Sequence, residues 1–221
     1  MNAIILAGGL SRRMNGTRKA FLRLGDETFL ERILGVLGPF VDSFLIVTNE
    51  PDRYAGFGAQ VVRDEREGVG PLMGICSGLK ASQSQTSFVT AVDTPLLAPG
   101  LVRHLAEDGD ECDARVPRWH GDVQPLCAVY SRRCLPAIEH VLDQERAGEG
   151  TSPGPGTGPG PGTNPRTGPR GRIIAFFPLV RVCIVEEPAV RKLDPEGISF
   201  FNVNTLKDYE SLRSLATDGG R

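Results

Sequence analysis

Short apolar runs alternate with amphipathic helical patterns over the first half of the chain, and this alternation restricts the possible folds more than any other feature. The runs are apolar on both faces, and they are Ile4–Ala7, Phe44–Val47, Val61–Val62 and Phe88–Val92. Strands of this kind are typical of a parallel sheet that helices cover on both sides. A strand followed by a helix and a further parallel strand implies right-handed βαβ units. The pattern therefore predicts an α/β fold with three layers around an open, mainly parallel sheet.

Each expected helix begins at a capping residue or at a proline that a first helical turn tolerates. The starting signals are Thr28 with Glu31, Pro71, Pro99, and Thr205 with Asp208. Glycines follow the first and last of these helices, at Gly38 and Gly219, where a helix commonly stops.

Glycine and proline are unusually frequent, with 27 and 17 residues, and the excess is concentrated in one segment. In residues 148–171, 15 of 24 residues are Gly or Pro, and no large apolar side chain is present to anchor a core. Such a stretch does not recover the entropy that ordering costs. We expect one domain formed by residues 1–147 and 172–221, with 148–171 as a disordered insertion that has no catalytic function.

Composition and charge exclude several classes of protein. A net charge of −2 argues against a nucleic-acid-binding protein. No apolar run is long enough to span a membrane, and the N-terminus lacks the basic start of a secretory signal. The five cysteines form no CxxC pair and the three histidines are scattered, so we expect neither a disulfide nor a zinc site. These features favour a cytoplasmic protein with cysteines buried as small apolar residues.

In open α/β sheets ligands bind at the carboxyl ends of the strands. The first apolar run is followed there by Gly8 and Gly9, which let the backbone approach a ligand, and then by the cations Arg12, Arg13, Arg18 and Lys19. A glycine turn followed by cations suits a polyphosphate, although a solvated basic loop is an equally weighted alternative. The segment has neither a GxxxxGK[ST] nor a GxGxxG pattern.

Carboxylates and amides follow the other runs. Asp93, before Pro95, is placed to bind Mg²⁺ or to cap a turn. Asp64 is placed to accept hydrogen bonds from a base or ribose, or to begin a turn. The oxygens of Asn202 and Asn204 could face a metal or substrate, while Asn204 could equally cap the last helix.

In this order, the motifs resemble those of the molybdenum cofactor guanylyltransferases, within the sugar-nucleotidyltransferase-like superfamily. The matching segments are Leu6-Ala7-Gly8-Gly9, Arg12-Arg13-Met14, Lys19, Gly70-Pro71-Leu72-Met73-Gly74, Val92-Asp93-Thr94-Pro95, Gly121–Tyr130 and Phe200–Thr205. The resemblance covers nearly the whole chain outside the Gly/Pro segment. It implies a Rossmann-like nucleotidyltransferase fold and transfer of GMP from GTP to the terminal phosphate of molybdopterin, with release of pyrophosphate.

The resemblance also implies roles for individual residues. GTP would contact the backbone of Leu6, Ala7, Gly8 and Gly9, and its triphosphate would be neutralised by Lys19 and Arg13. The nucleoside would face Asp64 and Asn49. Mg²⁺ would bind to Asp93, and Asn204 would lie near the metal or the pterin phosphate. Thr48 is an equal choice to Asn49. The product would pass to molybdenum enzymes or their chaperones. No nucleic acid or membrane partner is expected.

Two positions depart from the family pattern. Arg18 stands where the family has Asp before the lysine, and Asn15 replaces a glycine. A like charge beside Lys19 would alter the position of its side chain, and Asn15 would restrict the loop.

Three alternatives remain open. A related enzyme could use CTP, although molybdopterin cytidylyltransferases typically carry LAAG rather than LAGG. Another phosphorylated compound could be the acceptor. A non-catalytic adaptor that delivers the cofactor is a third possibility, against which the basic loop and Asp93 argue.

Overall fold

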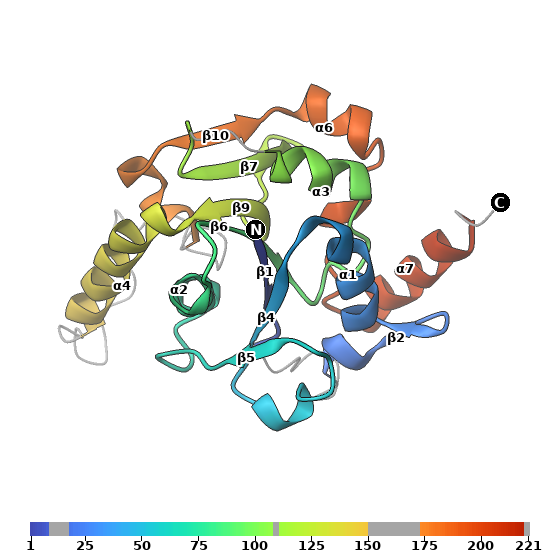
Figure 1. Ribbon diagram of the computed structural model, residues 1–221. Helices are drawn as coiled ribbons and strands as arrows, with labels where there is room; N and C mark the ends of the chain where they lie inside the picture. Colours follow the sequence, from blue (N-terminus) through green and yellow to red (C-terminus); the bar gives the residue numbers. More distant parts are fainter. Residues whose placement is uncertain (9–17, 108–110, 150–172, 219–221) are drawn as a thin grey trace, which may run out of the picture.

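One open sheet forms the centre of the protein. The structure, a computed structural model, describes residues 1–8, 18–107, 111–149 and 173–218 (Figure 1). Seven strands lie in the order β10-β7-β9-β6-β1-β4-β5, and β8 pairs with β7 beside this row. Their bounds are β1 Asn2–Leu6, β4 Ser43–Val47, β5 Gln60–Val62, β6 Thr86–Ala91, β7 Ala114–Trp119, β8 Asp122–Val123, β9 Cys127–Ser131 and β10 Val182–Val185.

Most of the strand pairs are parallel. Strand β1 runs parallel to both β4 and β6, β4 runs parallel to β5, and β10 runs parallel to β7. Strand β9 is antiparallel to both of its neighbours, and β8 is antiparallel to β7. The predicted α/β class with a mainly parallel sheet is therefore confirmed.

Helices cover both faces of the sheet, which gives the predicted three layers (Figure 1). Helices α2 and α4 lie on one face, and α1, α3 and α6 lie on the other. The helices are α1 Phe29–Leu37, α2 Pro71–Ala81, α3 Pro99–Ala106, α4 Leu135–Glu149, α6 Glu187–Leu193 and α7 Leu206–Asp218. Helix α7 packs instead against the small hairpin of β2 (Arg23–Leu24) and β3 (Glu27–Thr28), where the Tyr209 hydroxyl donates to the Arg23 carbonyl at 2.6 Å.

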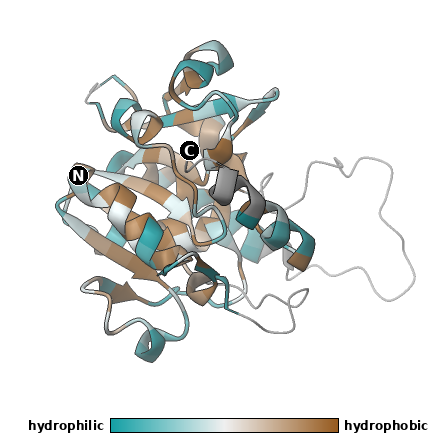
Figure 2. Cartoon of the chain, turned by 90° about the vertical axis from the view of Figure 1, so that its right-hand side faces the viewer, coloured by the Kyte–Doolittle hydropathy of each residue, from teal (hydrophilic) through white to brown (hydrophobic). Residues whose placement is uncertain are grey.

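The two-sided core follows from the alternation of side chains along the strands. In β1, Ile4 and Leu6 join the core beneath α2 and α4, while Ala3 and Ile5 join the core beneath α1 and α3. Figure 2 shows the corresponding apolar strands between helices of mixed polarity. Helix α2 approaches β1 closely, because a Cβ atom at Gly78 would lie 2.5 Å from Ile4 Cγ2. Helices thus cover the faces of the strands, and ligands of open α/β sheets bind at the carboxyl ends of the strands.

For the four strands and four helices that the sequence signals predict, the ends agree to within about two residues, the usual uncertainty in element ends. Thr28 and Glu31 form both hydrogen bonds of the predicted capping box at the start of α1. Pro71 and Pro99 lie in the first turns of α2 and α3. Thr205 caps the last helix, with its hydroxyl accepting from the Asp208 N–H at 3.1 Å.

The prediction that the cysteines form no disulfide is wrong for one pair. Cys112 and Cys183 are joined, with their Cα atoms 5.7 Å apart and a separation of 71 positions in sequence. They meet because edge strand β10 pairs with β7, which begins just after Cys112. Cys76, Cys127 and Cys134 are free and buried, as expected.

Most of the Gly/Pro segment lies outside the described residues. Helix α4 continues to Glu149, and the described chain resumes at Ile173. The boundaries of the insertion, and the single domain around it, stay predictions. Within the described ranges, no helix combines the length and apolar character that crossing a membrane requires.

Candidate active site

The candidate site lies at the carboxyl ends of β1, β4, β5 and β6. These strands are parallel neighbours, so the residues that follow them meet at one edge of the sheet. The backbone holds the end of β1 firmly: Val92 N–H donates to the Leu6 carbonyl at 3.1 Å, and Ala7 N–H donates to the Val47 carbonyl at 2.9 Å. Gly8 is the first residue beyond these two bonds.

Lys19 connects three segments that are far apart in sequence. Its Nζ donates to Asp93 Oδ2 at 3.2 Å and to Asn204 Oδ1 at 2.7 Å. The Lys19 and Asp93 side chains are 15% and 22% exposed, so their ion pair is largely shielded from water. Val203 N–H also donates to the Asp93 carbonyl at 2.9 Å, which joins the segment before α7 to the end of β6. Lys19, Asp93 and Asn204 therefore form one cluster, and their predicted roles stay predictions.

The side chain of Asn204 does not cap helix α7. Asp208 Oδ2 accepts from the N–H groups of Asn204 and Thr205, at 2.9 and 2.8 Å. These bonds lower the pKa of Asp208, with the Asn204 N–H the largest cause. Since Thr205 and Asp208 complete the cap, the carboxamide of Asn204 is available to Lys19. Asn202 turns away to donate to the Phe200 carbonyl at 3.0 Å.

Asp64 and Asn49 form a second cluster at the same edge. Asn49 Nδ2 donates to Asp64 Oδ2 across a long 3.5 Å. Burial raises the pKa of Asp64, and the bond from Asn49 opposes this shift only in part. Thr48 is 1% exposed, and its hydroxyl accepts from the Glu50 N–H at 3.2 Å. Of the two alternative residues, Asn49 thus faces Asp64, whereas Thr48 supports the local turn.

Two glycines border Asp64. A Cβ atom at Gly8 would lie 4.0 Å from Asp64 Oδ2, and one at Gly74 would lie 3.5 Å from Oδ1 and 3.1 Å from a methyl group of Leu6. Gly74 thus lets the first turns of α2 lie close to the end of β1. The glycine at this position matches the motif Gly70–Gly74, but no local pattern indicates that it adjoins Asp64.

The two clusters hold acceptor atoms that no described residue satisfies. Four buried side-chain nitrogen or oxygen atoms have no hydrogen-bond partner within the described residues, and three belong to this edge: Asn49 Oδ1, Asp64 Oδ1 and Asp93 Oδ1. Buried polar atoms are nearly always hydrogen-bonded in folded proteins. Their concentration at one edge of the sheet is typical of a ligand-binding site.

The oxygen atoms of this site also fit a divalent cation whose other ligands come mainly from a bound substrate. Asp93 gives one oxygen to Lys19, and its other oxygen is among the open acceptors. Mg²⁺ commonly uses one or two carboxylates and takes its other ligands from phosphate and water. The part of the chain that is described holds no group of three or more His, Cys, Asp or Glu side chains suited to a metal. A cation at Asp93 would therefore depend on a bound phosphate.

Arg18 does not disturb Lys19 in the way that its like charge suggests. Its guanidinium forms an ion pair with Glu50, while Lys19 points to Asp93 and Asn204. Sequence reasoning missed Glu50, whose one local signal is its position directly after Asn49. It also missed Tyr54, whose hydroxyl donates to the Ala7 carbonyl at 3.5 Å. Gly9 and Arg13, the other predicted site residues, lie outside the described residues.

Comparisons with known proteins agree with this geometry. Residues 3–151 match the MobA-like NTP transferase domain. A molybdenum cofactor guanylyltransferase of Desulfosudis oleivorans is 32% identical over 99% of this chain and 97% of its own. A probable molybdenum cofactor guanylyltransferase of Pelotomaculum thermopropionicum is 35% identical over 96% of this chain and 92% of its own.

A solved structure shows the same fold over the same length. The crystal structure of molybdopterin-guanine dinucleotide biosynthesis protein A from Archaeoglobus fulgidus superposes with a TM-score of 0.74 at 25% identity, and the match covers 99% of this chain and 100% of that one. The match therefore includes the segments before and after the Gly/Pro stretch. The chain belongs to the MobA-like NTP transferases, among the molybdenum cofactor guanylyltransferases.

Proposed function

We propose that the protein transfers GMP from GTP to the terminal phosphate of molybdopterin. An oxygen of that phosphate forms a bond to the α-phosphorus of GTP, the bond from this phosphorus to the β-phosphate oxygen breaks, and pyrophosphate leaves. The attacking phosphate is already an anion, so the reaction needs no general base. Positioning and charge neutralisation then supply most of the rate enhancement.

The contact of Lys19 with both Asp93 and Asn204 carries the proposal. An ammonium group has three N–H donors, and these two residues accept from it. The structure gives its third donor no further acceptor among the described residues, and we assign this donor to a triphosphate oxygen. Lys19 would thereby hold the triphosphate while Asp93 and Asn204 orient its amino group.

The second cluster would bind the nucleoside. Asp64 and Asn49 each offer an open oxygen to N–H or O–H donors of a base or ribose. The adjacent Gly8 belongs to the Leu6-Ala7-Gly8-Gly9 motif, which supports GTP over CTP. The backbone of Leu6, Ala7, Gly8 and Gly9 and the side chain of Arg13 complete the proposed GTP contacts.

Asp93 is the residue that we propose for Mg²⁺. When bound with the nucleotide, the ion would offset the charge that develops on the departing pyrophosphate. The oxygen of Asp93 that has no partner among the described residues supports this assignment.

A direct assay tests the proposed function. The full chain is incubated with Mo-molybdopterin, Mg²⁺ and one of GTP, CTP or ATP, and both pyrophosphate and the dinucleotide product are measured. We expect both products with GTP. Products with CTP alone would contradict the guanine assignment, and none with any nucleotide would favour a cofactor-delivery adaptor.

A further inference from the structure

An ion pair connects the two segments that carry the proposed GTP-binding residues. Arg18 and Glu50 pair through their side chains, which are 22% and 35% exposed. Neither of the two residues belongs to the Lys19 cluster or to the Asp64 cluster described above.

Each residue of the pair is the chain neighbour of a proposed GTP-binding residue. Arg18 directly precedes Lys19, and its carbonyl accepts from the Phe21 N–H at 3.1 Å in the short helical turn η2 (Lys19–Phe21). Glu50 directly follows Asn49, and its N–H donates to the Thr48 hydroxyl. Both backbones are thus held by local hydrogen bonds, and the ion pair connects the chain neighbours of Lys19 and Asn49.

Aromatic side chains join the same two segments a second time. The Phe21 ring lies 5.3 Å from the Tyr54 ring and 6.1 Å from the Phe57 ring, centroid to centroid. Tyr54 is 1% exposed. The rings pack the two segments together from within, and the ion pair joins them at the surface.

Glu50 also interacts with a second cation, since Arg53 Nε lies 3.7 Å from its carboxylate. The Glu50 carboxylate therefore interacts with two guanidinium groups. Loss of Glu50 would leave the local charge more positive, which by itself attracts a triphosphate. Loss of the ion pair would instead weaken the connection between the segment of Lys19 and the segment of Asn49, so the two effects on GTP affinity have opposite signs.

We propose that Arg18 and Glu50 form a positioning pair that sets the spacing between the triphosphate-binding lysine and the nucleoside-binding asparagine. This inference rests on the proposed function. Neither residue needs to contact GTP, because each acts through its neighbour in the chain. A displacement of about 1 Å in such a group is enough to cost considerable activity.

The test uses four variants of the full chain: Arg18→Glu, Glu50→Gln, Glu50→Arg and the double variant Arg18→Glu/Glu50→Arg. GTP affinity is measured by calorimetry with Mg²⁺, and Tm is measured without nucleotide. We expect each single variant to lose affinity by about fivefold, with Tm lower by no more than about 2 °C, the scale of a partly exposed ion pair. The double variant should regain most of the affinity.

Three different roles for the pair would each produce a distinct result. If charge alone matters, Glu50→Gln and Glu50→Arg bind GTP more tightly, which overturns the inference. If Arg18 itself contacts phosphate, the double variant stays as weak as Arg18→Glu, which also overturns it. If the pair only stabilises the fold, Tm falls while GTP affinity stays unchanged, with the same consequence.

A matched control lies at the other end of the sheet. Arg133 Nε is paired with Asp113 Oδ1 at 2.7 Å, so Arg133→Glu breaks an ion pair remote from the site. We expect this variant to lose stability and to keep its GTP affinity; an equal loss of affinity there would mean that the effect is general. Wild-type protein that binds no GTP would contradict the proposed function itself, a result distinct from normal binding in all four variants.

Discussion

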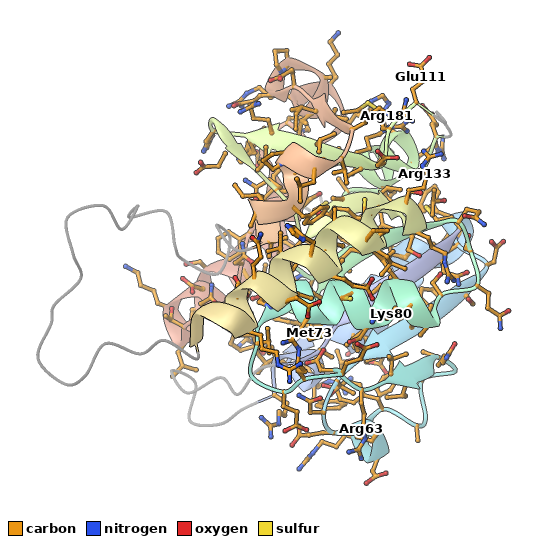
Figure 3. All side chains as sticks on the ribbon, turned by 90° about the vertical axis from the view of Figure 1, so that its left-hand side faces the viewer. Arg63, Met73, Lys80, Glu111, Arg133 and Arg181 are labelled. Carbon is orange, nitrogen blue, oxygen red and sulfur yellow. A yellow bond between two sulfur atoms is a disulfide. The ribbon has the colours of Figure 1, made fainter. Side chains whose placement is uncertain are left out.

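Carboxylates at the two ends of the sheet differ in how completely they are hydrogen-bonded. At the carboxyl ends of the strands, Asp64 and Asp93 each keep a buried oxygen without a partner among the described residues. At the opposite end, Asp113 accepts from Arg133 Nε at 2.7 Å and from the Arg181 N–H at 2.9 Å. Figure 3 shows Arg133 and Arg181 at one corner of the molecule. The disulfide of the adjacent Cys112 joins the segment before β7 to β10 at this end.

This difference indicates that the carboxylate at one end contributes to the stability of the fold, whereas those at the other end are suited to binding a ligand. The bonds to Asp113, led by the Arg181 N–H, lower its pKa, so its charged form stabilises the fold. Burial raises the pKa of Asp64, so its charged form costs stability. Carboxylates that are left incompletely paired at the end of a sheet are expected where a ligand supplies the remaining interactions. Substitutions at the two ends should therefore have separable effects on binding and on stability.

The largest effect is expected for Asp93→Ala. Loss of the proposed metal ligand should reduce GMP transfer by about a thousandfold, the scale on which electrostatic groups of an active site act. The fold should persist, because Asp93 lies at a strand end. Pyrophosphate release measures the rate, and circular dichroism checks the fold. Activity retained in this variant would refute the metal-binding role, whereas Asp113→Ala should lose stability and keep its activity.

The disulfide should matter for stability and little for GTP. Replacing both Cys112 and Cys183 with serine should lower the free energy of unfolding by about 3 kcal/mol, as expected for a crosslink that closes a long loop. Denaturant unfolding measures this change. Reductant should destabilise the wild type and leave the double variant unaffected. A large loss of GTP affinity in the variant would show that the two ends of the sheet are coupled.

Lys19→Ala should weaken GTP binding by about thirtyfold, since a charge-assisted hydrogen bond to phosphate contributes about 2 kcal/mol. Calorimetry measures the affinity. Lys192→Ala, which removes an exposed lysine of α6, is the matched control for net charge. Unchanged affinity in Lys19→Ala would count against the triphosphate assignment, and Arg18 would then be tested first.

The smallest effect is expected for Asp64→Asn, which should raise stability where the other substitutions lower it or leave it unchanged. Asp64→Asn should weaken GTP binding while raising Tm by roughly 2 °C at neutral pH, a gain common when a functional residue is relieved of strain. The raised pKa means that the native state loses stability as pH rises from the unfolded to the folded pKa. The Tm difference should therefore disappear in acid, where Asp64 is protonated. A variant less stable than the wild type at pH 7 would contradict this account.

The sequence allowed the layers and the site edge to be predicted because both depend on local patterns. The two-sided apolar runs identified β1, β4, β5 and β6, and the rule for strand ends then placed Asp64 and Asp93 at the same edge of the sheet. Thr28 and Thr205 likewise carry their capping partners three residues away. Such signals need no knowledge of distant contacts.

Contacts between distant segments could not be predicted in this way. Glu50 pairs with Arg18 across 32 residues, and Cys112 reaches Cys183 across 71. The disulfide depends on β10 pairing with β7, an arrangement of edge strands that no local pattern specifies. The place of Gly74 beside Asp64 likewise follows from how α2 packs on β1.

The difference between the carboxylates at the two ends of the sheet is tested most directly by a thermal-shift titration with GTP and Mg²⁺. It uses three proteins: the wild type, Asp93→Ala and Asp113→Ala. At saturating GTP the wild type should gain about 5 °C in Tm, since a ligand at a hundredfold excess over its Kd adds about 2.7 kcal/mol. Asp113→Ala should begin at a lower Tm and gain as much, and Asp93→Ala should gain far less. An equal gain in Asp93→Ala, or none in the wild type, would contradict the assignment of the open carboxylates to GTP and its metal.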